Sequence, residues 1–176
     1  MTEPVTQPPT GPTEPPVLPQ QVSSSRLRLI LISAADAADM LAGRHQARWH
    51  RDYPRQDDVD AASMVGDGRS TWGARHVVAD LQAIGSIGFF GPPQDGEVEV
   101  GYGLVPEARG RGLVTEALRA LLADTDLLGV RVRASVEPSN AAGLRVLATT
   151  GFTELRGSNE DGHLVMVRPL PAGGPG

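Results

Sequence analysis

The sequence predicts an α+β domain built on a mixed, mostly antiparallel central sheet of about six to seven strands flanked by helices. Two observations predict this class. The first half of the chain holds short segments in which apolar and polar residues alternate, which is typical of antiparallel hairpins. The second half alternates between strand-like and helix-like segments, which is typical of strands joined through helices.

Three strands and two short helices are expected between residues 26 and 91. The segment "RLRLILIS" (26–33) alternates and then becomes apolar, which predicts the first strand. "AADAADMLAG" (34–43) and "DDVDAASMVGDG" (57–68) predict helices, the second with aspartates at its favourable N-terminal end. "ARHVVADLQ" (74–82) and "AIGSIGFFG" (83–91) predict two strands joined by a tight turn.

The second half is expected to begin with a long strand, "GEVEVGYGLV" (96–105). Its strict alternation puts Glu97 and Glu99 on one face and the valines that follow them on the other. Apolar residues at helical spacing then predict a helix that begins near Arg111 or Gly112. The remaining elements are a strand over 129–137, a helix over 138–152 that runs into 152–155, and a final strand over 162–170.

The two ends of the chain differ in composition from its middle. Residues 1–24 are rich in Pro, Gln and Thr and are expected to form a disordered tail, and residues 171–176 a flexible C-terminal tail. One domain is therefore expected over 25–170. The N-terminus lacks the basic start and apolar core of a signal peptide, and no apolar run reaches the ~20 residues that span a bilayer. The sequence therefore predicts a cytoplasmic protein with no membrane partner.

Two residue types are absent from the sequence, and each absence excludes a class of chemistry. The chain has no Cys, which excludes a disulfide framework, a thiolate zinc site and a covalent intermediate on a protein sulfur. It has no Lys, since all 16 of its positive residues are Arg, which excludes a Schiff base. A net charge of −5 argues against nucleic-acid binding. No metal is expected, because no metal-ligand spacing joins His45, His50, His76 and His163.

The segment "PEARGRGLVTEALRALL" (106–122) combines two Arg and two Gly at the start of a predicted helix. Free backbone N–H groups and the positive end of the helix dipole point out of such a terminus. Gly110 and Gly112 leave room for a bulky anion on the backbone, and the two arginines, Arg109 and Arg111, add forked donors that suit phosphate. One interpretation is a pyrophosphate cradle, and the other is a glycine turn with two solvated arginines. A P-loop is excluded because its Lys is missing.

Two motifs in order, "VEVGYGLVPEARGRGLVTEALRALL" and "VEPSNAAGLRVLATTGFTEL", resemble the GCN5-related N-acetyltransferases (GNAT), in particular their RimJ/RimL-like branch. Arg109 and Gly112 match the family signature Gln/Arg-x-x-Gly-x-Gly/Ala, whereas Val114 stands where Gly or Ala is usual. The resemblance covers about residues 26–168 and implies the GNAT fold and a site for acetyl-coenzyme A. The cofactor contacts that it implies are Leu104, Val105, Arg109, Gly110, Arg111, Gly112, Leu113, Val114, Thr115 and Asn140.

The resemblance also implies how some of these residues act. Leu104 and Val105 are expected to offer free backbone N–H groups where the long strand separates from its neighbour, which can hold the pantetheine arm and polarise the acetyl carbonyl. Asn140 is implied to hold the pantetheine or phosphate arm, and capping of the following helix is its other, compatible role. Gly143, inside that helix, is expected to allow close approach of the cofactor.

Glu99 is the candidate general base, because it matches the Glu that the family places before "GY". A carboxylate there can take a proton directly or through water if burial raises its pKa. An exposed strand residue without a catalytic role is the alternative, and Glu97 on the same face is the less favoured base.

The general acid is where this sequence departs from its relatives. Many relatives have Tyr at the position of Leu147, and RimL-like members have Ser at the position of Gly143, so neither residue here can donate a proton. Tyr102, Ser139 or water stay open as donors, and so does a thiolate that leaves unaided.

The segment "ARWHRDYPRQDDVD" (47–60) lies where the family builds the wall of its acceptor site. Trp49 and Tyr53, together with His50, are expected to line a substrate pocket. The aspartates Asp57, Asp58 and Asp60 are expected to attract a cationic amine. Packed aromatics and a helix-cap cluster are the alternative interpretation.

The expected function is transfer of an acetyl group from acetyl-coenzyme A to a primary amine, on a small molecule or at a peptide N-terminus. Direct attack in a ternary complex is expected, because the chain has no Cys on which the acetyl group could wait. A non-catalytic or weakly active regulatory module that binds acetyl-coenzyme A is the alternative. The protein is expected to be a monomer or a homodimer.

Overall fold

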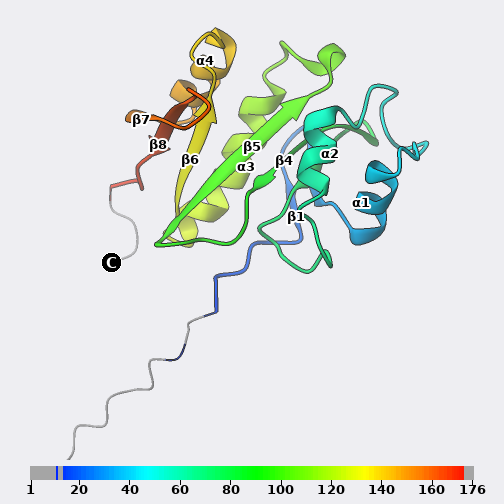
Figure 1. The fold of residues 1–176 in the computed structure, drawn as a ribbon, viewed down its shortest axis with the longest axis horizontal. Helices are drawn as coiled ribbons and strands as arrows, with labels where there is room; N and C mark the ends of the chain where they lie inside the picture. The colour runs from blue at the N-terminus through cyan, green and yellow to red at the C-terminus, as the bar shows by residue number, and fades with distance from the viewer. Residues whose placement is uncertain (1–10, 12–13, 173–176) are drawn as a thin grey trace, which may run out of the picture.

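Eight strands form one sheet in the order β1-β2-β3-β4-β5-β6-β8-β7 in the computed structural model, which describes residues 11 and 14–172 (Figure 1). The strands are β1 Gln21–Ser23, β2 Arg28–Leu31, β3 Arg75–Ala79, β4 Gln82–Phe89, β5 Glu97–Leu104, β6 Arg131–Val136, β7 Glu154–Ser158 and β8 Leu164–Arg168. The helices are α1 Ala34–Leu41, α2 Gln56–Ala62, α3 Leu113–Leu127 and α4 Ala141–Thr149, and a 3₁₀ turn, Pro106–Ala108, precedes α3. The expected α+β class is confirmed, and the strand count is slightly higher than expected.

The sheet is antiparallel except between β5 and β6, which are parallel and joined by the crossover through α3. Their pairing runs only from Glu97 opposite Arg131 to Glu99 opposite Arg133. Beyond Glu99, β5 continues to Leu104 along β4, whereas β6 continues along β8. The sheet therefore opens between β5 and β6, beside the carboxyl end of β5.

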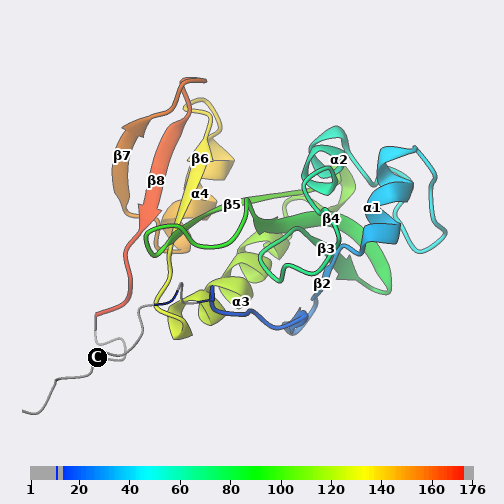
Figure 2. The same ribbon diagram turned by 60° about the horizontal axis from the view of Figure 1, so that its bottom comes forward.

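Helices cover both faces of the sheet (Figure 2). α3 lies beneath it and contacts β1, β5 and β6, whereas α1 and α2 pack against each other on the opposite side. The apolar stripe that the sequence predicts in α3 is the face it buries, through Ala117, Leu118 and Leu121. Because α3 is fixed along the sheet in this way, its N-terminus is held next to the end of β5.

The N-terminal boundary differs from the expected one. Residues 21–23 form β1 against β2, and Leu18 is only 2% exposed. Trp72 Nε1 donates to Pro16 O, and the buried guanidinium of Arg75 donates to Pro19 O and Gln20 O. A Pro-rich composition predicts disorder, but here buried donors bind three carbonyl groups of residues 14–20, a segment that we call the N-terminal strap. The rest of the two expected tails, residues 1–10, 12–13 and 173–176, lies outside the described residues.

Two features are absent from the part of the chain that the structure describes. There, no helix is long and apolar enough to cross a bilayer. Over the same residues, no three His, Cys, Asp or Glu side chains come together as ligands of a metal ion.

Candidate functional site

A cavity of about 610 Å³ lies where β5 and β6 separate. β4 and β5 form its floor, α2 forms one wall, and the end of β6, the start of α4 and the β7–β8 turn form the other. Its lining includes Glu99 and Tyr102 of the floor, and Ser135 and Asn140 of the second wall. The elements that the sequence motifs occupy therefore meet at one opening.

Alternation along β5 decides which backbone N–H groups face this opening. Val105 N–H donates to Ile84 O at 2.8 Å, and Phe90 N–H donates to Glu99 O at 3.0 Å, so the odd-numbered residues of β5 bond to β4. The N–H group of Leu104 therefore points away from β4, into the opening between β5 and β6, where it can donate to a ligand. The expectation for Val105 is wrong, because its N–H group is already bonded to β4.

The loop between β5 and α3 presents a run of open backbone donors. The N–H groups from Gly110 to Thr115 have no acceptor among the described residues, and α3 begins without a side-chain cap. Gly110 and Gly112 have φ of +79° and +73°, the left-handed region that glycine adopts without strain. A Cβ at Gly110 would meet nothing within 4 Å. Open amides without covering side chains at a helix N-terminus fit the pyrophosphate of coenzyme A.

Two arginines flank these amides and keep their charge available. Arg109 Nε donates to Leu104 O at 3.0 Å, and Arg111 Nη2 donates to Glu107 O at 2.9 Å. Each guanidinium is tied to the loop backbone, and neither forms an ion pair with a residue in the described ranges. Oriented and uncompensated guanidinium groups are suited to phosphate.

A third arginine, Arg26, joins the same place from the turn between β1 and β2. Its Nε donates to Glu116 Oε1 at 2.7 Å and its Nη1 to Arg111 O at 3.0 Å. Its Nη2 lies 3.8 Å from the position of a Cβ on Gly112. Sequence reasoning missed Arg26 because no local pattern marks it: the pair with Glu116 joins residues 90 apart in the chain.

Asn140 caps α4, since its Oδ1 accepts from Gly143 N–H at 2.9 Å, and it also lines the cavity. A Cβ on Gly143 would lie 2.6 Å from Asn140 Nδ2, so the cap itself requires a small residue there. This contact is one reason for glycine, and close approach of the cofactor stays a prediction. Leu147 is 1% exposed in the core. Neither position supplies a general acid.

Glu99 is held across the last paired point of β5 and β6. Ser135 Oγ donates to Glu99 Oε1 at 2.8 Å, and Arg133 Nε lies 3.7 Å from the same oxygen. The Glu99 side chain is 26% exposed and lines the cavity. It is thus a positioned carboxylate with access to a ligand.

Glu97, the other candidate base, belongs to an ion-pair cluster instead. Arg156 Nη2 donates to its Oε1 at 2.7 Å, and Arg133 Nη1 donates to its Oε2 at 2.9 Å. The hydrogen bonds from Arg156 and Arg133 lower the pKa of Glu97 to about 2. A carboxylate with so low a pKa is a poor proton acceptor at neutral pH, which leaves Glu99 as the candidate base.

Of the residues that stayed open as general acid, Tyr102 lines the cavity, whereas Ser139 is exposed outside it. Burial raises the pKa of the Tyr102 hydroxyl to about 12. Tyr102 therefore stays protonated throughout the neutral range, although the alternation of β5 directs its side chain to the opposite face from Glu99.

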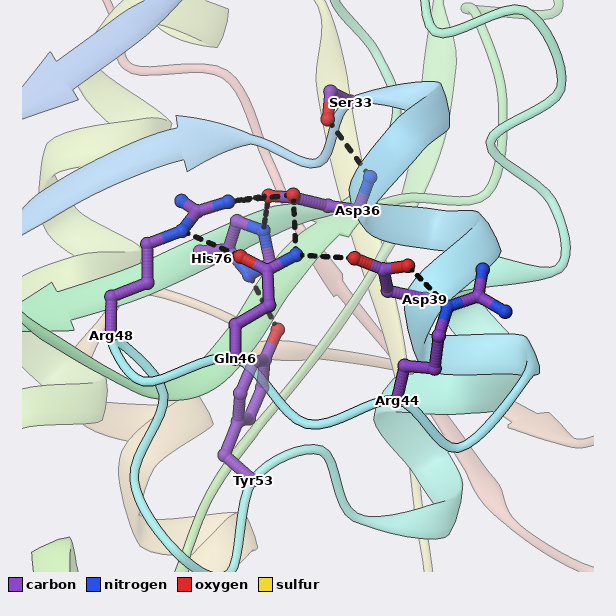
Figure 3. A network of polar contacts seen from close by, with 8 residues as sticks. All are labelled: Ser33, Asp36, Asp39, Arg44, Gln46, Arg48, Tyr53 and His76. Carbon is purple, nitrogen blue, oxygen red and sulfur yellow. Dashed lines mark hydrogen bonds and ion pairs between the residues drawn. The ribbon is translucent and has the colours of Figure 1, made fainter.

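Trp49 and Tyr53 do not line the cavity. They are 2% and 1% exposed, and their rings pack edge to face with centroids 5.8 Å apart. Figure 3 shows the Tyr53 hydroxyl directed at His76, where it lies 2.7 Å from Nδ1, while His76 Nε2 lies 2.8 Å from Asp36 Oδ2. Because the carboxylate only accepts, His76 donates through Nε2. Burial lowers the pKa of His76, so Nδ1 of the neutral ring accepts a hydrogen bond from the Tyr53 hydroxyl. The substrate-wall role is thus wrong for both aromatics, which pack in the core.

The polar residues of the same segment divide among three environments. Asp57 and Asp60 line the cavity from α2. Asp58 is fully buried and accepts from Arg55 and from Ser86 in β4. His50 lies in a separate hollow of about 350 Å³, where its Nε2 is 2.8 Å from Glu107 Oε2. Of the three aspartates, only Asp57 and Asp60 are therefore placed to meet an acceptor in the cavity.

The architecture and sequence match known acetyltransferases. The family model described as the acetyltransferase (GNAT) domain matches residues 26–153. Among solved structures, a Bordetella pertussis protein assigned to the GnaT family is 27% identical, with a TM-score of 0.62, over 85% of this chain and 99% of its own. RimJ of Mycobacterium smegmatis, in complex with CoA-disulfide, is 20% identical, with a TM-score of 0.62, over 85% and 87%.

The ribosomal-protein-S5-alanine acetyltransferase of Vibrio fischeri is 18% identical, with a TM-score of 0.59, over 88% of this chain and 99% of its own. Curated protein sequences gave no match. Because the family model matches most of the sequence, the chain belongs to the acetyltransferase (GNAT) domain family.

Proposed function

We propose that this protein transfers the acetyl group of acetyl-coenzyme A to a primary amine by direct attack within a ternary complex. The observation that carries the proposal is the course of β5. This strand places Glu99 in the cavity and then leads into the open amides from Gly110 to Thr115. Membership of the GNAT family supports the reaction class, and the fold that the chain shares with RimJ, solved with CoA-disulfide, supports the ligand.

The residues of the β5–α3 loop would hold the coenzyme. The amides from Gly110 to Thr115 and the guanidinium groups of Arg109, Arg111 and Arg26 face its phosphates. Leu104 N–H and Asn140 face its pantetheine arm and acyl end. Acetyl-coenzyme A supplies the acetyl group as a thioester.

Glu99 accepts the proton that the attacking amine loses, directly or through a water molecule. Ser135 keeps the carboxylate directed into the cavity. A C–N bond forms and the C–S bond breaks, and the sulfur leaves with the bonding electron pair. Leu104 N–H stabilises negative charge on the acyl oxygen if the carbonyl lies in the opening.

Tyr102 is suited to bind the leaving sulfur but not to protonate it. Its pKa of about 12 makes it a weaker acid than a thiol of pKa ~8.5. If the sulfur lies on the Tyr102 side of β5, this hydroxyl donates a hydrogen bond to the thiolate and retains its proton. The thiolate therefore leaves as an anion and takes a proton from solvent, so the lack of an acid at Gly143 and Leu147 does not block the reaction.

The test is release of free thiol from acetyl-coenzyme A across a panel of primary amines, compared with release without amine. Amine-dependent release supports the transferase. A second candidate function, a module that binds acetyl-coenzyme A without turnover, is favoured by the missing acid. Stabilisation of the fold by acetyl-coenzyme A without amine-dependent thiol release would support that module. No stabilisation at saturating acetyl-coenzyme A would contradict both.

A further inference from the structure

We infer that the acceptor carries a second positive charge near the amine that is acetylated, as an alkyl diamine or polyamine does, and that Asp57 and Asp60 bind this second charge. The inference rests on the proposed function, because it names the substrate class of the same cavity.

The first argument is the face that α2 presents to the cavity. Asp57, Asp60, Ala61 and Met64 line it. These positions are three, four and seven residues apart, so they form one stripe along one side of the helix and its C-terminal turn. The adjacent aspartate, Asp58, is fully buried and is already bonded to Arg55 and Ser86, so it is not available to a ligand. The stripe therefore combines two carboxylates with two apolar side chains opposite Glu99.

The second argument is the charge balance of the lining. Asp57 and Asp60 form no ion pair with a described residue, and Glu137 and Asp161 on the opposite wall form none either. The arginine of the lining, Arg55, is committed to Asp58 at 2.8 Å. Unpaired carboxylates on several elements around one concave surface create a negative potential that concentrates cations. A peptide N-terminus without a second positive charge gains less from this potential, because only its own α-ammonium is attracted.

The third argument is apolar surface at the same place. Met64 is 59% exposed and Phe90 is 51% exposed, although both line the cavity. The Phe90 ring lies over Gly101, where a Cβ would come within 2.7 Å of its Cζ. A diamine has its chemical groups in the matching order. One amine lies at Glu99, the methylene groups lie against Phe90 and Met64, and the second ammonium lies at the two aspartates. The face of an aromatic ring also attracts ammonium groups.

The test compares pentylamine with its diamine analogue, which differs only by an ammonium at the far end. Full-length protein, saturating acetyl-coenzyme A and thiol release are used for both. We expect kcat/KM to be roughly tenfold higher for the diamine, the effect of about two well-placed surface ion pairs. The preference should shrink as salt is raised, because exposed charges are screened.

The variant Asp57→Asn with Asp60→Asn should bring the ratio of the two kcat/KM values towards one. The matched control is Asp67→Asn with Asp95→Asn, which changes the net charge equally at two exposed residues outside the cavity lining. The control should keep the wild-type ratio. Stabilisation of the fold by acetyl-coenzyme A should be unchanged in both variants.

Other outcomes separate this inference from the proposed function. Equal kcat/KM for the two amines, or an unchanged ratio in the Asp57 and Asp60 variant, overturns the inference and leaves acetyl transfer intact. A higher kcat/KM for an uncharged or acidic peptide N-terminus than for the diamine also overturns it. Absence of acetylation of any amine, with acetyl-coenzyme A still stabilising the fold, removes the proposed function and the inference with it.

Discussion

Ser135 Oγ on β6 donates a 2.8 Å hydrogen bond to Glu99 Oε1 on β5, at the last point where the two strands pair. One oxygen of the carboxylate is thereby fixed, and the other accepts no hydrogen bond from the described residues. Glu99 thus belongs to the last pair between β5 and β6 and also lines the cavity. The point at which the two strands separate is therefore also the point that positions the candidate base.

Glu99→Gln should lower turnover by roughly 10²–10⁴, the usual range for loss of a general base. The amide keeps the size of the side chain but cannot take a proton at neutral pH. The loss should shrink at high pH, where the amine arrives already deprotonated. Affinity for acetyl-coenzyme A, measured by calorimetry, should barely change.

Ser135→Ala serves as the matched variant, since it retains the carboxylate and removes only the hydrogen bond that positions it. We expect a smaller loss of turnover than in Glu99→Gln. Full activity of Glu99→Gln at pH 7 would falsify the assignment of the base.

Gly112→Asp should abolish binding of acetyl-coenzyme A while the protein stays folded. A carboxylate at this position would lie among the open amides where phosphate is proposed to bind. Gly112→Asn is the control, because Asn has the same size and both residues tolerate the positive φ of +73°. In wild type, a hundredfold excess of acetyl-coenzyme A over Kd should stabilise the fold by ~2.7 kcal/mol. If the Asp and Asn variants gave equal ligand-induced shifts in Tm, the phosphates would have to bind elsewhere.

Glu97→Gln should lower the free energy of unfolding at neutral pH by about 1–2 kcal/mol, because Arg156 and Arg133 lose a charged acceptor and are themselves partly exposed. The pKa of Glu97 is about 2 in the folded protein, below its ordinary value of 4.5. The carboxylate therefore stabilises the fold fully above about pH 4.5, and this contribution is lost as the pH falls through about 2. Urea denaturation of both proteins should show a constant difference down to about pH 5 that shrinks below it. A difference that persists undiminished near pH 2 would contradict the ion-pair account.

Leu18→Ala should lower the free energy of unfolding by about 2–5 kcal/mol, because Leu18 is only 2% exposed within the N-terminal strap. Its neighbour Val17 is 74% exposed, so Val17→Ala should change stability by no more than about 0.5 kcal/mol. Chemical denaturation of the two variants gives the comparison. Equal small effects would mean that the strap is not part of the folded core in solution.

The fold was predictable where local pattern and tertiary packing agree. Alternation identified the long strand that carries Glu99, and helical spacing identified the buried face of α3. The open amides from Gly110 to Thr115 followed from glycine and arginine at a helix start. These features depend on neighbours in sequence.

Features that depend on distant contacts were not predictable. The N-terminal strap is ordered because Arg75, Trp72 and Thr71 donate to or accept from its backbone. Val105 loses its free N–H group only because β4 pairs in that register. Trp49 and Tyr53 look like pocket residues in the sequence, yet His76, from the distant strand β3, supplies the hydrogen-bond partner that lets the Tyr53 hydroxyl be buried. Arg26 reaches its site only through Glu116.

Glu116 belongs to the first turn of α3, and it also accepts from Ser24 Oγ and from the backbone N–H of Arg26. The first turn of α3, which carries the last of the open amides, is thus also the turn to which the β1–β2 hairpin is attached. Two processes that share a structural element are thermodynamically linked, and the linkage is reciprocal. A ligand that orders this turn should therefore slow hydrogen exchange at the backbone amides of β1 and β2, which themselves do not contact it. Displacement of the hairpin should in turn weaken binding of this ligand, by the same factor by which the ligand favours the attached hairpin.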